Sequence, residues 1–189
     1  MDMELFPALG FGWLYGWVLI AIWLAIQGLS VLLVPKDVRE RLFEFDRSSW
    51  SKRHRILFAS GKMCGLVYLV LAAFTPIKIG SIEFIIGLVV YLVGLSGLVK
   101  AVYDFKITPL DRPVAIGLYR VSRHPQLVML FILGIGLSIS LSSWTLLLIR
   151  ILAFGLEHSG VLAEEQECVK RFGESYREYM ESVPRYLII

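Results

Sequence analysis

The chain has 189 residues, of which 57% are hydrophobic and 19% are charged, and its mean hydropathy is +0.69. This composition excludes an ordinary soluble domain, which is about half apolar and about a quarter charged. The net charge of +3 is small and the basic residues lie in polar loops, so we expect no nucleic-acid partner. The two cysteines, Cys64 and Cys168, lack the spacing of metal ligands, and we expect no metal site.

Long apolar runs dominate the chain, and residues 9–34 contain no charged side chain. A cleaved signal peptide is the alternative for this run, but Asp2 and Glu4 stand where such peptides carry Lys or Arg. Because a backbone in lipid must form its hydrogen bonds internally, the runs are expected to be helices. We therefore predict an all-α polytopic membrane protein, a single domain over residues 1–189. About five transmembrane helices of ~20 residues are expected, at residues 11–34, 56–75, 82–102, 126–141 and 143–163.

Two shorter polar helices are predicted outside the spans. Residues 37–40 have the pattern of a capping box and indicate a short helix in the loop before the second span, followed by residues that suggest contact with the membrane surface: Leu42, Phe43, Phe45 and Trp50. In the tail, apolar residues recur at helical spacing: Val169, Phe172, Tyr176, Tyr179 and Val183. They predict a C-terminal amphipathic helix that packs on the domain or the membrane surface and can also cover a pocket.

The basic residues indicate an orientation in the membrane. They concentrate in residues 35–55, 103–125 and 164–189, which five spans place on one side, whereas the opposite side has only Lys78. Cytoplasmic loops carry the excess of Lys and Arg. We therefore expect the N-terminus outside and the C-terminus in the cytoplasm, with the active site on the cytoplasmic side.

The fourth and fifth spans form a hairpin with polar residues at both ends. Arg123 and His124 precede the hairpin, and Glu164 and Glu165 follow it. Because a hairpin returns the chain to the side it left, these four residues are expected to share one pocket. A basic group and an acidic group facing one another suit a zwitterionic or sulfonium ligand.

The entrance of this hairpin favours an anionic group. Pro125 suits the first turn of a helix, whose free N–H groups attract negative charge. The planar donors of Arg123 match a carboxylate, and the alternative is that they bind the phosphate of a lipid head group. Glu164 and Glu165 can accept hydrogen bonds from an amine or from ribose hydroxyls.

Ionisable residues also occur inside the fifth span. Arg150, Glu157 and Glu164 are seven residues apart and therefore lie along one helix face, with His158 beside them. Such residues in a span usually face a cavity or a partner. Either Arg150 and Glu157 form an ion pair that fixes helix packing, or they line a polar wall that leads to a ligand. In an enzyme, Arg123 or Arg150 would orient a carboxylate substrate, and Glu157 or His158 would take a proton from an amine.

Glycines at short spacing predict close helix packing in the membrane. The pairs are Gly12 with Gly16, Gly61 with Gly65, Gly94 with Gly97 and Gly134 with Gly136. In the last of these pairs, Gly134 and Gly136 lie in the fourth span. This last pair also allows an alternative, in which a ligand approaches the backbone of the fourth span.

Several of these residues together resemble a known family. The motif Gly117-x-Tyr119-x-x-x-Arg123-His124-Pro125 is followed by Glu164-Glu165, Phe172-Gly173, Tyr176, Tyr179 and Val183-Pro184-Arg185. This set is similar to the C-terminal signature of the isoprenylcysteine carboxyl methyltransferase and phospholipid methyltransferase superfamily. The resemblance covers residues 117–185 and implies a cofactor-binding region for S-adenosylmethionine that includes Gly117 and Tyr119. It also implies a lipid or prenylated small-molecule substrate that enters from the bilayer.

The sequence departs from that signature at three positions. Leu118 replaces the usual proline after the first glycine, and Leu127 and Met129 replace a tyrosine and a glycine after His-Pro. The acceptor therefore stays open between an isoprenylcysteine carboxylate, a phospholipid amine and a small thiol. Two other functions remain as alternatives, an NADPH-dependent membrane reductase with a similar Arg-His-Pro turn and a non-catalytic lipid-binding protein. A Rossmann methyltransferase is excluded because no Gly-x-Gly-x-x-Gly follows a strand.

Overall fold

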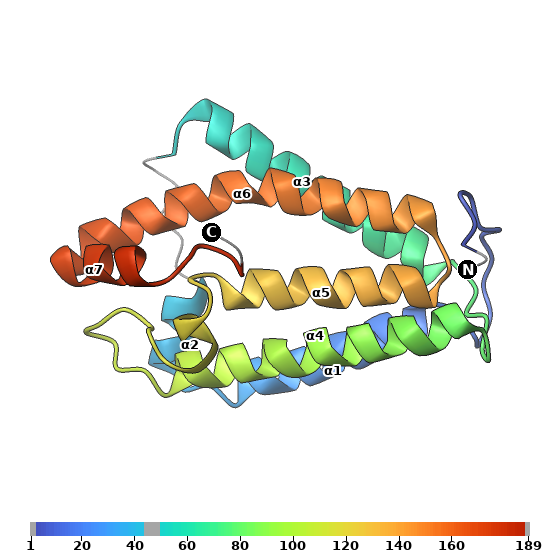
Figure 1. Ribbon diagram of the computed structural model, residues 1–189, viewed down its shortest axis with the longest axis horizontal. Helices are drawn as coiled ribbons and strands as arrows, with labels where there is room; N and C mark the ends of the chain where they lie inside the picture. The colour runs from blue at the N-terminus through green and yellow to red at the C-terminus, as the bar shows by residue number, and fades with distance from the viewer. Residues whose placement is uncertain (1–2, 44–49, 188–189) are drawn as a thin grey trace.

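The computed structural model describes residues 3–43 and 50–187, shown in Figure 1. Throughout these residues the regular secondary structure is helical, as predicted. The helices, with η1 a short 3₁₀ helix, are α1 (Trp17–Leu32), α2 (Lys36–Phe43), α3 (Lys52–Ala73), α4 (Ile82–Lys106), η1 (Gly117–Arg120), α5 (Pro125–Ser140), α6 (Trp144–Phe172) and α7 (Glu174–Ser182).

The five predicted spans correspond to α1, α3, α4, α5 and α6. Of the described helices, α3, α4 and α6 are long and apolar enough to cross a membrane, and α1 and α5 are shorter apolar helices of 16 residues each. At 1.5 Å per residue the two shorter helices extend about 24 Å, somewhat less than the ~30 Å hydrocarbon core. The fold is that of an all-α integral membrane protein.

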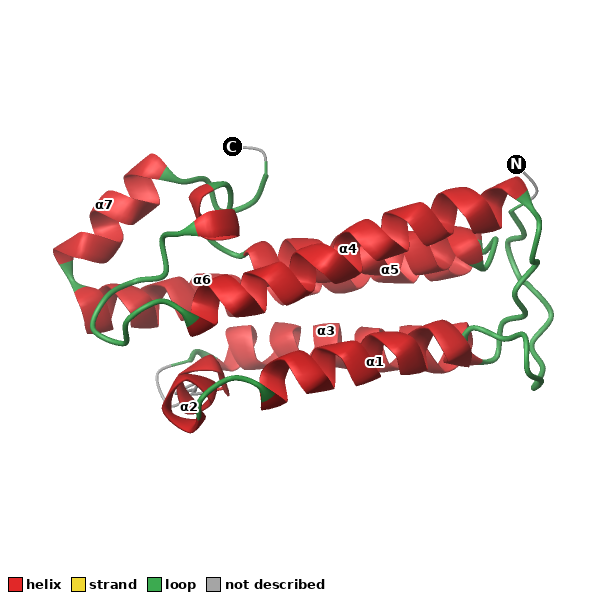
Figure 2. Cartoon of the chain, turned by 90° about the horizontal axis from the view of Figure 1, so that it is seen from below, coloured by secondary structure: helices red, strands yellow, loops and turns green. Residues whose placement is uncertain are grey.

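The long helices run along the length of the molecule, and the polar elements gather at one end (Figure 1). The α4–α5 and α3–α6 pairs make the most extensive contacts. Seen in the second view, α1 and α3 lie in one layer and α4 and α5 in the other (Figure 2). The short helices α2, η1 and α7 lie at the end where α5 begins, and the N-terminal segment lies at the opposite end.

Glycines bring the backbones of α4 and α5 together, which confirms the predicted close packing at Gly94 and Gly136, whereas an added Cβ at Gly65 would meet no atom within 4 Å. A Cβ added at Gly94 would lie 2.3 Å from the backbone nitrogen of Leu133. A Cβ at Gly136 would lie 2.2 Å from the backbone nitrogen of Tyr91. Beside Gly134 the space is filled by the side chain of Arg150, since a Cβ there would meet its Nε at 2.8 Å. The side chain of Arg150 therefore covers this glycine.

The first helix starts later than predicted, at Trp17 instead of residue 11. The preceding residues pair with the segment after α3: the N–H of Gly10 donates to the carbonyl of Phe74, and the N–H of Gly16 donates to that of Thr75. A Cβ at Gly16 would lie 2.1 Å from the carbonyl oxygen of Ala72. These tertiary hydrogen bonds replace the helical ones, so the apolar residues before Trp17 are not helical.

The bounds of α6, of the C-terminal amphipathic helix and of α2 also differ from the prediction. The α6 helix continues past the predicted end at residue 163 and stops at Phe172, where Gly173 adopts a positive φ of 59°. The predicted C-terminal amphipathic helix is therefore divided into the end of α6 and a separate α7. The loop helix α2 begins at Lys36, one residue before the predicted cap. Phe45 lies outside the described residues.

Candidate functional site

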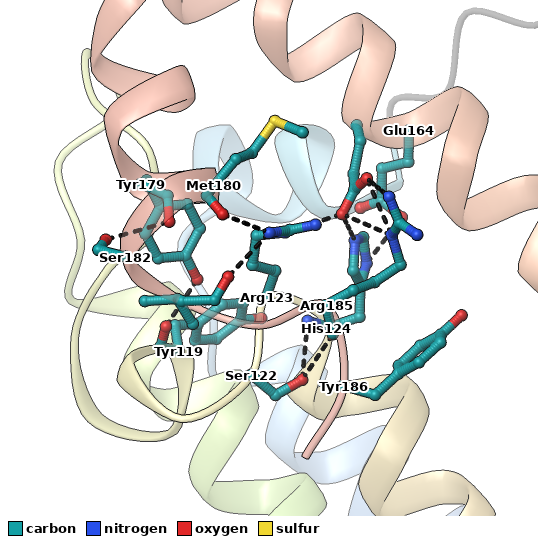
Figure 3. Close-up of polar contacts among 12 residues, drawn as sticks. Tyr119, Ser122, Arg123, His124, Glu164, Tyr179, Met180, Ser182, Arg185 and Tyr186 are labelled. Atoms are coloured by element: carbon teal, nitrogen blue, oxygen red, sulfur yellow. Dashed lines mark hydrogen bonds and ion pairs between the residues drawn. The ribbon is translucent and has the colours of Figure 1, made fainter. Parts of the chain in front are cut away.

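The polar end of the molecule brings both halves of the sequence motif together. The α6 helix has 29 residues and extends about 43 Å, longer than the ~30 Å hydrocarbon core. The region after Ala163 therefore stands outside the membrane-spanning part, and Glu164 and Glu165 lie at its start. There α6 meets the beginning of α5, and the chain after α7 returns across both, a segment that we call the C-terminal arm (residues 183–187; Figure 3).

Glu165 is the centre of this cluster and its side chain is only 4% exposed. Its Oε1 accepts a hydrogen bond from Nε of Arg123 at 2.8 Å. Arg185 of the C-terminal arm donates from Nε and Nη2 to Oε2, at 3.0 and 2.8 Å. Nε2 of His124 lies 3.3 Å from Oε1. Three basic side chains, which Figure 3 labels, thus surround one buried carboxylate.

This environment keeps Glu165 ionised. Burial alone would raise the pKa of the carboxyl group, but the hydrogen bonds from His124, Arg185 and Arg123 outweigh it and lower the pKa to about 2. The two motif halves therefore bind one another directly. Arg123, which the sequence suggested as the receptor of a ligand carboxylate, uses its Nε for a protein carboxylate.

Glu164 is more accessible than its neighbour, although burial still raises the pKa of its carboxyl group. Its side chain is 41% exposed, and its Oε2 lies 3.6 Å from Nδ1 of His124. His124 is buried and stands at the residue immediately before α5, with Pro125 in the first turn as predicted. The imidazole therefore lies between a buried and a partly exposed carboxylate. Glu164 is the acidic group of the motif that a ligand can reach.

The C-terminal arm and α7 are attached to the residues that precede α5. Nη1 of Arg123 donates to the carbonyls of Met180 and Val183, each at 2.8 Å. The backbone N–H of Arg123 donates to the carbonyl of Pro184 at 3.0 Å. The hydroxyl of Ser122 donates to the carbonyl of Arg185 at 2.9 Å. Arg123 therefore holds both the C-terminal arm and the side chain of Glu165 in place.

The start of the motif is fixed against α4. A Cβ at Gly117, whose φ is +55°, would collide with the carboxylate of Asp104. Asp104 is 1% exposed, accepts a hydrogen bond from the N–H of Leu118 at 2.9 Å and pairs with Lys100. Only glycine fits here, because the positive φ is unfavourable for other residues and a side chain would overlap the carboxylate of Asp104.

Tyr119 links this start to α5 and α7. Its hydroxyl accepts a hydrogen bond from Nε2 of Gln126 at 2.9 Å, and its carbonyl accepts one from the hydroxyl of Tyr179 at 2.6 Å. Burial raises the pKa of the Tyr119 hydroxyl, which therefore stays protonated and able to donate.

The ionisable residues inside the span are not part of this cluster. Arg150 is fourteen residues before Glu164 on a continuous helix, which separates them by about 21 Å along its axis. Nη1 of Arg150 lies 3.6 Å from Glu157, and Nζ of Lys62 lies 3.3 Å from the same carboxylate. The ion pair expected as one alternative is thus present. Within the described part of the chain, Nε and Nη2 of Arg150 have no hydrogen-bond partner.

His158 lies closer to the cluster through the C-terminal arm. Its Nδ1 is 2.9 Å from the hydroxyl of Tyr186, whose ring also packs on Phe154. Arg185 and Tyr186 were not among the site residues predicted from the sequence. The signal for Arg185 was its place in the Val-Pro-Arg motif, whereas nothing in the sequence distinguishes Tyr186 or Asp104.

Comparison with known proteins places the chain in a family. The family DUF1295, described as "Protein of unknown function", matches residues 36–183, and the chain belongs to it. No curated protein matches the chain. The matched range contains η1, the α5–α6 hairpin and α7, and therefore most of the cluster around Glu165.

Proposed function

We propose that this member of the DUF1295 family is an integral membrane methyltransferase that uses S-adenosylmethionine and a lipophilic acceptor. The observation that carries the proposal is the hydrogen-bonded cluster of Arg123, His124 and Glu165 at the polar end of the molecule. This cluster leaves the neighbouring Glu164 partly exposed. A site next to lipid with an accessible carboxylate suits a positively charged cofactor and an apolar substrate.

The residues present fit such a cofactor. The partly exposed carboxylate of Glu164 would accept hydrogen bonds from an amine or from ribose hydroxyls, and the start of α5 would attract a carboxylate. His124 would orient Glu164, and Gly117, Tyr119, Pro125 and the Glu165 cluster would shape the site. When bound, S-adenosylmethionine supplies an electrophilic methyl group.

The protein's part in the chemistry would be to position the acceptor and exclude water. For an amine acceptor, His158 would take the proton, since its Nδ1 is already oriented by Tyr186. Glu157, whose carboxylate contacts both Arg150 and Lys62, is a second candidate. Arg150, about 21 Å from Glu164, would act on the acceptor only at a distance or through packing.

The acceptor we favour is an isoprenylcysteine-like carboxylate, with a phospholipid amine or a small thiol as alternatives. We also propose that the N-terminus is outside and that the cluster and C-terminus are cytoplasmic. The concentration of Lys and Arg at the polar end supports this orientation.

Calorimetry with S-adenosylmethionine tests the proposal. We expect binding by the purified protein in detergent, weakened at least about tenfold in Glu164→Gln because a charged acceptor is lost. Glu178→Gln is the matched control, since Glu178 is an exposed carboxylate of α7 outside the cluster. Well-folded protein that does not bind S-adenosylmethionine would refute the proposal. Binding of NADPH in its place would favour the reductase.

A further inference from the structure

A groove of about 340 Å³ lies between α3 and α6, apart from the cluster around Glu165. It is lined by residues from both helices: Arg53, His54, Leu57, Gly155, Leu156, His158, Ser159 and Leu162. No role follows for most of them from the proposed methyl transfer. We propose that this groove binds one anionic phospholipid of the surrounding bilayer.

The groove is polar at one end and apolar at the other. Arg53 and His54 lie in the first turn of α3, at the polar end of the molecule. Leu162 and Gly155 are seven residues apart on α6, so the groove continues about 10 Å toward the apolar part of the spans. This polarity matches the orientation of a phospholipid, with its head group at the surface and its chain beside the helices.

The basic residues at the polar end of the groove favour a phospholipid whose head group carries a net negative charge. Within the described residues, no hydrogen bond or ion pair engages the side chain of Arg53 or the ring of His54. The guanidinium of Arg53 and the imidazole of His54 can donate to phosphate oxygens, and the lining contains no carboxylate to oppose them.

Gly155 lines the apolar end of the groove. An added Cβ at Gly155 meets no atom within 4 Å, because it would project into open space. Gly155→Leu therefore fills the groove without disturbing the helix contacts. Gly65→Leu is its matched control, since Gly65 is an equally open helical glycine that does not line the groove.

Titration with defined lipids in detergent, followed by native mass spectrometry, tests the proposal. We expect one phosphatidylglycerol per chain, bound more tightly than phosphatidylcholine with the same acyl chains. Arg53→Gln should weaken this binding about fivefold, since one basic residue near the surface is removed. Gly155→Leu should abolish it, whereas Gly65→Leu and Arg177→Gln, a surface arginine of α7, should leave it unchanged.

Other outcomes would overturn the proposal. Equal binding of the two phospholipids would show that charge does not select the occupant, and binding of oleate alone would indicate a single-chain acid. Unchanged binding in Gly155→Leu would place the lipid elsewhere. Binding of S-adenosylmethionine to Gly155→Leu, measured in parallel, separates this proposal from the methyltransferase, because either can fail while the other holds.

Discussion

At the scale of single residues, Glu165 shows how one carboxylate can organise a site. It receives hydrogen bonds from residues before α5 and after α7, at 2.8 Å from Arg123 and 2.8 Å from Arg185. Segments that are about 60 residues apart in the chain are thereby fixed to α6. Removing such a carboxylate leaves buried positive charges without a partner, which costs more than the pair itself contributes.

The same residue predicts how stability depends on pH. In the folded protein the pKa of Glu165 is about 2, below its ordinary value of 4.5. The ionised carboxylate therefore stabilises the fold fully above about pH 4.5, and this contribution is lost as the pH falls toward 2. We therefore expect the temperature midpoint of thermal unfolding in detergent to decrease as the pH is lowered from about 6 to about 3.

In Glu165→Gln that pH-dependent decrease should be smaller, and the midpoint at pH 6 should already be low because Arg123 and Arg185 lose their charged partner. Glu178→Gln should keep the dependence of the unmodified protein. If Glu165→Gln retained the full decrease, other carboxylates would be responsible for it.

At the scale of elements, close packing of glycines holds α4 against α5. Lipid provides no hydrophobic force between helices, so such contacts depend on short distances and van der Waals packing. Gly94 lies against the backbone of Leu133, which cannot move aside as a flexible side chain would. The position of α5, and therefore of His124 at its beginning, depends on this contact.

Gly94→Ala should accordingly lower the free energy of unfolding by about 1–3 kcal/mol, as expected for an overpacked contact. Gly65→Ala is the control, and it should leave stability unchanged or raise it by less than about 1 kcal/mol, because its Cβ meets no atom. Thermal unfolding of both variants in the same detergent measures the difference. Equal stability of the two would show that α5 can shift at no cost.

At the scale of the whole molecule, the two ends differ in character. The cluster, α2 and α7 share one end, and the loop between α3 and α4 lies at the other with the N-terminal segment (Figure 1). The proposed orientation places the first end in the cytoplasm. Labelling of intact cells with an impermeant maleimide tests it, in a Cys64→Ser, Cys168→Ser background.

In that background Ile79→Cys, in the exposed α3–α4 loop, should be labelled from outside. Glu178→Cys, on the exposed face of α7, should react only after the membrane is permeabilised. The reverse pattern would invert the orientation and place the candidate site outside.

The sequence by itself determined the helical class, the approximate positions of the five apolar helices and the placement of Arg123 and Glu165 at the same end of the hairpin. Each depends on local rules, since apolar runs in lipid must be helical and a hairpin returns the chain to its starting side. Only the tertiary structure decided that the two motif halves bind one another, that Arg185 joins them and that Glu164 remains accessible. The contribution of Arg185 depends on the path of the chain after Gly173, where the positive φ of 59° ends α6 and allows the C-terminal arm to return across α5.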